Sequence, residues 1–180
     1  RQEARRASAR LAQRRGNFPL YGGSIFDQPD TLHMRNATVT TIAPTGTISL
    51  YAGNVSSGIE PVFAYGYTRK VLQKDGTRTE EEVVDYAVQA WRAKFGDTPL
   101  PEHFVDAQSL APADHVKMQA AAQKWVDSSI SKTINCPADI SFEAFKDVYV
   151  QAYETGCKGC TTYRPNAVTG SVLSVAAEET

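Results

Sequence analysis

The sequence predicts an α/β fold with largely parallel strand pairing, and three of its features support this prediction. Segments with the apolar spacing of helices alternate with short runs of β-branched and apolar residues, as in βαβ units. The 180 residues are 42% hydrophobic and 22% charged, an ordinary globular composition with enough length for one sizeable core. The chain contains no internal repeat and no low-complexity segment. We therefore expect residues 1–180 to form a single unit.

An arginine-rich amphipathic segment opens the chain, and we expect it to form a helix over residues 2–15 that ends at Gly16. Its apolar residues share one helical face: Ala4, Ala7 and Leu11. An organelle transit peptide is the alternative for such a start, although Glu3 argues against it. Because the chain begins at Arg1 in the middle of this pattern, we expect it to be a fragment of a longer protein.

The next part of the chain leads to a loop of special composition. Turn-forming residues dominate positions 18–33, which we expect to be irregular. β-branched residues crowd together at 38–42 and predict a short buried strand. This strand runs directly into residues 43–49, with the sequence Ala-Pro-Thr-Gly-Thr-Ile-Ser.

Three further helices are predicted downstream. The acids that follow Thr79 indicate a helix start, because acidic groups stabilise the positive end of a helix. The second helix is expected over residues 112–129, and the third from Asp139 or Ser141 to Thr155. The expected buried faces are Val84, Val88, Trp91 and Phe95 in the first, Met118, Ala121, Ala122 and Trp125 in the second, and Phe145, Val148, Tyr149 and Ala152 in the third.

Two short strands flank the last of these helices. We expect them at residues 133–134 and 159–163, which gives a strand-helix-strand order typical of parallel pairing. A polar, acidic end follows, and residues 168–180 are expected to fray.

Bulk properties exclude several classes of protein. A formal net charge of -1 gives no general attraction for nucleic acid or an anionic membrane, so any bound anion must be held locally. No apolar run approaches the roughly 18 residues that span a bilayer, and the start does not resemble a secretory signal. The 3 cysteines do not suggest a disulfide framework. We therefore expect a cytoplasmic protein with reduced thiols and no membrane partner.

The loop at residues 43–49 is the most informative candidate site. Pro44 restricts its backbone, Gly46 lets the backbone come close to a ligand, and three hydroxyl side chains offer hydrogen bonds. A helix starting near Thr47 would supply free N–H groups and a positive dipole end for a phosphate group. A plain turn with a hydroxyl cap is the alternative, and the P-loop pattern is absent.

Several segments, in this order, resemble parts of the catalytic domain of class II, adenosylcobalamin-dependent, ribonucleotide reductases. They are residues 43–49, 56–61 (Ser-Ser-Gly-Ile-Glu-Pro), 131–137 (Ser-Lys-Thr-Ile-Asn-Cys-Pro) and 156–164 (Gly-Cys-Lys-Gly-Cys-Thr-Thr-Tyr-Arg), and the early Arg15-Gly-Asn-Phe-Pro19 also fits. These matches are spread over most of the chain.

The resemblance implies that the chain is the C-terminal part of the ten-stranded α/β barrel of these reductases. In that family the loop binds the phosphates of a ribonucleoside di- or triphosphate, whose 2′-hydroxyl is removed by thiyl-radical chemistry for DNA synthesis. For the parent enzyme the resemblance implies adenosylcobalamin as cofactor and a thioredoxin-type reductant. The remainder of the catalytic domain is the expected partner of this chain, and the parent enzyme is expected to be a homodimer. The implied substrate-binding residues are Ala43, Pro44, Thr45, Gly46, Thr47 and Ser49.

The radical-bearing cysteine of this family is missing from the sequence. It lies in an Asn-x-Cys-x-Glu motif, which the surroundings of Cys136, Cys157 and Cys160 do not match. We therefore expect no catalytic residue in this chain, which would be inactive alone. No metal site is expected either, because Cys157 and Cys160 lack a second ligand pair at zinc spacing. All three thiols are interpreted as packed side chains, with a redox pair at 157 and 160 as the alternative.

Glu60 and the pair Thr161-Thr162 refine the hypothesis. Glu60 is expected to bind backbone groups and not to move protons. Class I reductases have adjacent tyrosines, which relay a radical, where this chain has Thr161 and Thr162. Their absence favours class II, in which cobalamin generates the radical locally. A class I or class III reductase fragment and a non-catalytic nucleotide- or phosphate-binding module remain as alternatives.

Overall fold

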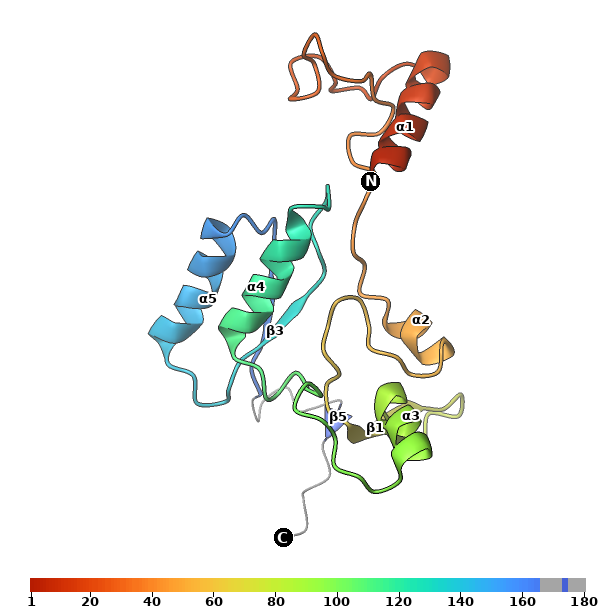
Figure 1. The fold of residues 1–180 in the computed structure, drawn as a ribbon, viewed down its shortest axis with the longest axis vertical. Coiled ribbons are helices and arrows are strands. Elements are labelled where there is room, and N and C mark those ends of the chain that lie inside the picture. The colour runs from red at the N-terminus through yellow and green to blue at the C-terminus, as the bar shows by residue number, and fades with distance from the viewer. Residues whose placement is uncertain (166–172, 175–180) are drawn as a thin grey trace.

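The computed structural model describes residues 1–165 and 173–174. Over these residues the elements are α1 (Gln2–Arg15), α2 (Gly46–Tyr51), β1 (Gly66–Leu72), β2 (Arg78–Val84), α3 (Tyr86–Phe95), α4 (Pro112–Gln123), β3 (Thr133–Asn135), α5 (Phe142–Glu154), β4 (Thr161–Tyr163) and β5 (Leu173–Ser174). Figure 1 shows α1 apart at one end, α4 and α5 side by side with β3, and α2 near α3 and β1. None of the helices in this part is long and apolar enough to cross a membrane.

The parallel α/β unit is the β3–α5–β4 segment. β3 and β4 pair in parallel from Thr133 with Thr161 to Asn135 with Tyr163, and α5 provides the connection between them. A further parallel bridge joins Ile42 to Ile130. The predicted α/β class is therefore confirmed, but the expectation of largely parallel pairing is wrong, because β1 pairs antiparallel with both β2 and β5. The described residues do not close a barrel, as expected for one part of it.

The core of this unit lies between α4, α5 and β3. Ile134 of β3 is completely buried, with an exposed fraction of 0%. The Oγ of Ser141 accepts a hydrogen bond from the N–H of Ala144 at 3.2 Å and caps α5, so the predicted third helix is confirmed. Its expected buried face is wrong at Tyr149, which is exposed. The buried cluster consists of Val116, Ile134, Cys136, Val148 and Ala152.

The helix start predicted at Thr79 is wrong. Residues 78–84 form β2, which pairs antiparallel with β1, and α3 begins only after Asp85. The Asp85 carboxylate caps α3 by accepting hydrogen bonds from two N–H groups of its first turn. Asp75 and Gly76 form the turn between the strands, with Gly76 at a φ of 85°. An Asp-Gly turn between β-forming segments is a hairpin signal, and it outweighed the acidic run.

The predicted boundaries and buried face of the second helix are also wrong. α4 ends at Gln123, and Met118 and Trp125 have exposed fractions of 58% and 73%. Its buried face contains polar groups, some of which bond to loop carbonyls: the Gln119 side-chain amide donates to the Gly159 carbonyl, whereas Gln119 Oε1 and His115 Nε2 have no hydrogen-bond partner among the described residues. The buried residues are His115, Val116, Gln119, Ala120 and Gln123.

The other predicted elements are partly confirmed. α1, the loop at 18–33 and the strand at 133–134 are found where expected, whereas the strand at 159–163 is reduced to β4. Residues 38–42 run beside 128–131, but only Ile42 forms a β-bridge, so the predicted strand is not formed. The tail expected to fray, 168–180, lies outside the described residues except for β5, which pairs with β1.

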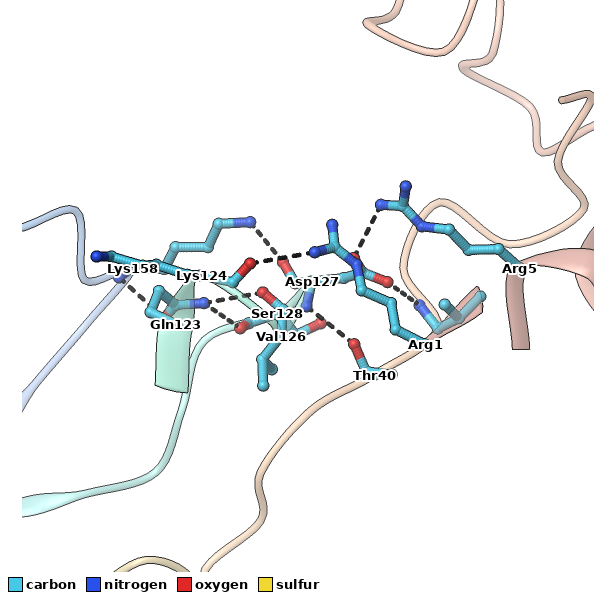
Figure 2. A network of polar contacts seen from close by, with 10 residues as sticks. Arg1, Arg5, Thr40, Gln123, Lys124, Val126, Asp127, Ser128 and Lys158 are labelled. Carbon is cyan, nitrogen blue, oxygen red and sulfur yellow. Dashed lines mark hydrogen bonds and ion pairs between the residues drawn. The ribbon is translucent and has the colours of Figure 1, made fainter. Parts of the chain in front are cut away.

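Asp127 joins α1 to the rest of the chain (Figure 2). Its Oδ1 forms an ion pair with Arg1 Nε at 3.1 Å and accepts a hydrogen bond from Arg5 Nη2 at 3.0 Å, and its Oδ2 accepts one from the Val39 N–H at 3.1 Å. Burial acts to raise the pKa of Asp127, but the Val39 N–H and the two arginines outweigh it and lower that pKa. The ionised carboxylate is therefore the form that holds these segments together.

Candidate functional site

The loop between residue 42 and α2 has an unusual backbone conformation. Thr45 lies in the left-handed region, with φ 52° and ψ 21°, which is unfavourable for a β-branched residue. Its Oγ1 accepts a hydrogen bond of 2.6 Å from the N–H of Gly58. A Cβ at Gly58 would lie 3.1 Å from the Ala43 carbonyl oxygen, so glycine is needed for this approach. The two segments singled out in the sequence therefore pack directly against each other.

α2 begins at Gly46, close to the predicted helix start. The first hydrogen bond of the helix runs from the Ser49 N–H to the Thr45 carbonyl. The N–H groups before Ser49 therefore have no partner within the helix, and no side chain caps them. Thr47 is exposed, whereas Ser49 is buried and its Oγ donates to the Gly46 carbonyl at 2.7 Å. The available groups at this end are therefore backbone N–H groups and the Thr47 hydroxyl.

Five of the six predicted binding residues are divided between two clefts. Gly46, Thr47 and Ser49 line a cleft of about 480 Å³, whose other walls include residues 54–57 and 61–64, Tyr67 and Asp85. Ala43 and Pro44 line a second cleft of about 490 Å³, beside Cys160 and Thr161. Thr45 lies between these groups and is bonded to Gly58. The structure thus brings three of the six together on one surface.

A buried charge cluster behind the loop was not predicted. The Nζ of Lys132 lies 3.0 Å from Glu60 Oε2 and 3.0 Å from His115 Nδ1, and the exposed fraction of the Lys132 side chain is 1%. The other carboxylate oxygen of Glu60 accepts from the N–H of Thr133. The expectation that Glu60 binds backbone is confirmed. In the sequence, only the closeness of Lys132 to a buried strand hinted at an enclosed charge.

His115 completes this cluster as an acceptor. Burial lowers the pKa of His115, and the nearby positive charge of Lys132 lowers it further; the Ala107 backbone, Glu60 and Asp114 act in the opposite direction. The imidazole is therefore neutral near pH 7. Its Nδ1 can then accept a hydrogen bond from the Lys132 ammonium group.

The three cysteines are free thiols in or beside the core. Burial raises the pKa of Cys136, and burial together with the neighbouring Cys157 raises the pKa of Cys160. Residues 1–165 contain no group of three or more His, Cys, Asp or Glu side chains that could hold a metal ion. These surroundings suit packed thiols better than reactive ones.

Cys136 and Cys160 are accordingly expected to react slowly with iodoacetamide at pH 8. Their raised pKa leaves less thiolate, the reactive form, and we expect rates at least about tenfold below those of the urea-unfolded chain. Mass spectrometry of peptides from timed alkylation measures each thiol separately. Labelling of Cys160 as fast in the native as in the unfolded chain would contradict the packed interpretation.

β4 carries Thr161 and Thr162, the positions at which the resemblance implies a tyrosine pair in class I reductases. Thr162 Oγ1 and the phenolic oxygen of Tyr149 are 2.9 Å apart. A threonine hydroxyl is much harder to oxidise than a phenol. The position is thus occupied by a hydrogen-bonding residue that cannot relay a radical.

Comparison with known proteins gives consistent matches. The family model described as "Ribonucleotide reductase, barrel domain" matches residues 30–163. A vitamin B12-dependent ribonucleoside-diphosphate reductase of Mycobacterium tuberculosis is 38% identical over 194 residues, which cover 98% of this chain and 27% of that protein. A reductase of the same name from Thermoplasma acidophilum is 38% identical over 198 residues, covering 99% of this chain and 25% of that protein. The chain thus spans about a quarter of the length of these relatives.

Solved structures share the fold. The class Id ribonucleotide reductase alpha subunit of Actinobacillus ureae superposes with a TM-score of 0.61 at 20% identity, covering 90% of this chain and 31% of that one. A B12-dependent, class II, ribonucleotide reductase gives a TM-score of 0.52 at 13% identity, covering 77% of this chain and 21% of that one. At these identities the likeness concerns the fold alone.

Proposed function

The chain belongs to the ribonucleotide reductase family, whose barrel domain it matches over residues 30–163, and we propose that it holds the substrate phosphates of a vitamin B12-dependent reductase. The parent enzyme would convert ribonucleotides to 2′-deoxyribonucleotides by thiyl-radical chemistry. The observation that carries this proposal is the hydrogen bond between Gly58 and Thr45, which holds the two family segments together at the start of α2.

The start of α2 has the groups that a phosphate needs. The N–H groups of Gly46 and Thr47 lie at the positive end of the helix and have no capping side chain. The exposed hydroxyl of Thr47 adds a donor on the same cleft. Ser49 supports this turn through its bond to the Gly46 carbonyl and contacts the ligand less directly. The left-handed Thr45 turns the chain into this arrangement.

A ribonucleoside diphosphate is the preferred substrate class. The relatives at 38% identity are named ribonucleoside-diphosphate reductases. Binding through backbone N–H groups and hydroxyls does not itself select the number of phosphates, so this choice rests on those names.

The radical source proposed for the parent enzyme is adenosylcobalamin. When bound, this cofactor initiates radical chemistry by homolysis of its cobalt–carbon bond. Thr161 and Thr162 fit such an enzyme, because they leave no tyrosine pair through which a second subunit could deliver a radical. Relatives named vitamin B12-dependent support the same choice.

The remainder of the catalytic domain is the proposed partner. The sequence has no Asn-x-Cys-x-Glu motif, so the chain alone is expected to be inactive. Tyr153 and Phe142 on α5 have exposed fractions of 84% and 76%, and β3 and β4 form a two-stranded sheet in the part of the chain that the structure describes. Such faces and edges are usually covered in a complete domain. A thioredoxin-type reductant, a homodimer and a cytoplasmic location complete the proposal for the parent enzyme.

Replacement of Thr45 or Thr47 by valine tests the phosphate loop in the whole reductase that contains this chain. We expect each variant to bind a ribonucleoside diphosphate about tenfold more weakly, since each loses a hydrogen bond at the site. Affinity for the nucleoside without phosphate is expected to stay the same. Isothermal titration calorimetry measures both.

The control for this test is Thr31→Val, which removes a threonine hydroxyl from the loop at 18–33. It is expected to leave the diphosphate affinity unchanged. Wild-type diphosphate affinity in both Thr45→Val and Thr47→Val would refute the phosphate-binding role.

A further inference from the structure

We propose that Lys132 is a positioning residue for the phosphate loop: its buried ammonium group, seated against His115, clamps Glu60 and fixes the end of segment 43–59. This inference rests on the proposed function of the loop. Lys132 lies behind the loop and lines neither of the two clefts, so it would act through Glu60 and not through the ligand.

Three consecutive residues hold both ends of the segment. Before the loop, the Ser131 N–H donates to the Ile42 carbonyl at 3.0 Å. After it, Glu60 binds the Lys132 ammonium group with one carboxylate oxygen and the Thr133 N–H with the other. The segment that carries Thr45 and Thr47 is therefore attached on both sides to residues 131–133, at the start of β3.

The turn at residues 56–60 connects Glu60 to Thr45 through its hydrogen bonds and its backbone. The Glu60 N–H donates to the Ser57 carbonyl at 2.9 Å, and the Ser56 hydroxyl donates to the Glu60 carbonyl. Within this turn, the Gly58 N–H donates to Thr45 Oγ1. A shift of Glu60 would move the turn and remove the bond that supports the left-handed conformation of Thr45.

The surroundings of Lys132 indicate that its charge, and not only its volume, is used. An ammonium group has three N–H donors. Lys132 Nζ has three acceptors: Glu60 Oε2 and His115 Nδ1, each at 3.0 Å, and the Thr133 carbonyl at 3.3 Å. These contacts hold the ammonium group of Lys132 in one place, and this position in turn determines where the Glu60 carboxylate lies. Removal of the lysine would leave a partly buried carboxylate unpaired.

Equilibrium binding to the whole reductase that contains this chain tests the inference. Lys132→Met is expected to weaken ribonucleoside diphosphate binding at least about tenfold, while affinity for the nucleoside stays the same. Glu60→Gln keeps an oxygen for the Thr133 N–H and is expected to cost about threefold. The double variant is expected to bind within about twofold of Glu60→Gln, because Lys132 acts through the Glu60 charge. Lys117→Met, which breaks the exposed ion pair with Asp114, is the matched control and is expected to bind like wild type.

The outcomes separate the inference from the function on which it rests. The positioning role would be overturned if Lys132→Met weakened diphosphate binding by the same factor in wild type and in Glu60→Gln. It would also be overturned if Lys132→Met weakened nucleoside binding as much as diphosphate binding. If Lys132→Met does not fold, the diphosphate affinity of Glu60→Gln tests the inference by itself. A wild-type affinity in Glu60→Gln would then overturn it. Weak binding by Thr45→Val beside wild-type binding by Lys132→Met would reject only the role of Lys132. Wild-type binding by both threonine variants would reject the phosphate loop itself.

Discussion

Replacing Ile134 by alanine is expected to lower the free energy of unfolding by about 3–4 kcal/mol, because it leaves a cavity among α4, α5 and β3. Ile134 is completely buried and belongs to the cluster with Val116 and Val148. Close packing on all sides leaves little room for the neighbours to collapse into the space. Urea unfolding of the 180-residue chain, followed by circular dichroism, measures the change.

Ile25→Ala is the matched control for this variant. Ile25 has an exposed fraction of 82%, so the same chemical change removes little buried area. We expect its free energy of unfolding to stay within about 0.5 kcal/mol of wild type. A loss below about 1 kcal/mol in Ile134→Ala would contradict the packing described for this core.

Asp127→Asn is expected to destabilise the chain by about 2 kcal/mol at pH 7. The Asp127 side chain is 7% exposed and accepts hydrogen bonds from Arg5 and the Val39 N–H, which are worth more when the acceptor is charged, and it forms an ion pair with Arg1. Arg1 and Arg5 are each about one third exposed, so solvent screens part of this gain. The loss is expected to free α1 first, which limited proteolysis near residue 16 would detect.

The stabilisation by Asp127 is expected to depend on pH in one direction. Because the pKa of Asp127 is lowered by folding, its contribution is complete above the pKa of the unfolded chain, about 4, and disappears as the pH falls below that value. The stability difference between wild type and Asp127→Asn should therefore be constant from about pH 5 to 7 and shrink toward pH 3. Asp97→Asn, at a fully exposed position, should show no such difference. A gap that widens with acid would be inconsistent with this account.

Elements with strong local signals were predicted correctly. The third helix begins after Ser141, one of its two expected starts, and ends beside the expected Thr155, because a cap and a stop act on the backbone next to them. The strand before that helix was also found, and the parallel pairing of β3 with β4 follows from the helix between them.

Errors arose where distant groups outweighed local preference. The acids after Thr79 lie in a strand because β1 pairs with them across the turn at Gly76. α4 buries Gln119 and exposes Met118, since the Gln119 amide donates to the Gly159 carbonyl of a distant loop. Gln123 is buried too, with its amide donating to the Val126 and Ser128 carbonyls just after the helix. A periodicity argument assigns polar residues to solvent and has no information on such partners.

In the candidate site, too, the local features were predicted and the long-range contacts were not. The composition of residues 43–49 predicted a loop and helix start able to hold a phosphate, and the family resemblance placed it in a reductase. The joining of Thr45 to Gly58 and the burial of Lys132 between His115 and Glu60 were not predictable, because these residues are far apart in the sequence.

Local backbone chemistry, helix caps and family motifs were thus determined by the sequence itself, since each depends on residues within one or two turns of one another. Only the tertiary structure decided which polar side chains are buried, which cleft each loop residue faces and what holds the loop from behind. The physical reason is that a buried polar group is stable only with its partners in place. For Lys132 those partners come from three separate parts of the chain: residue 60, α4 and the start of β3.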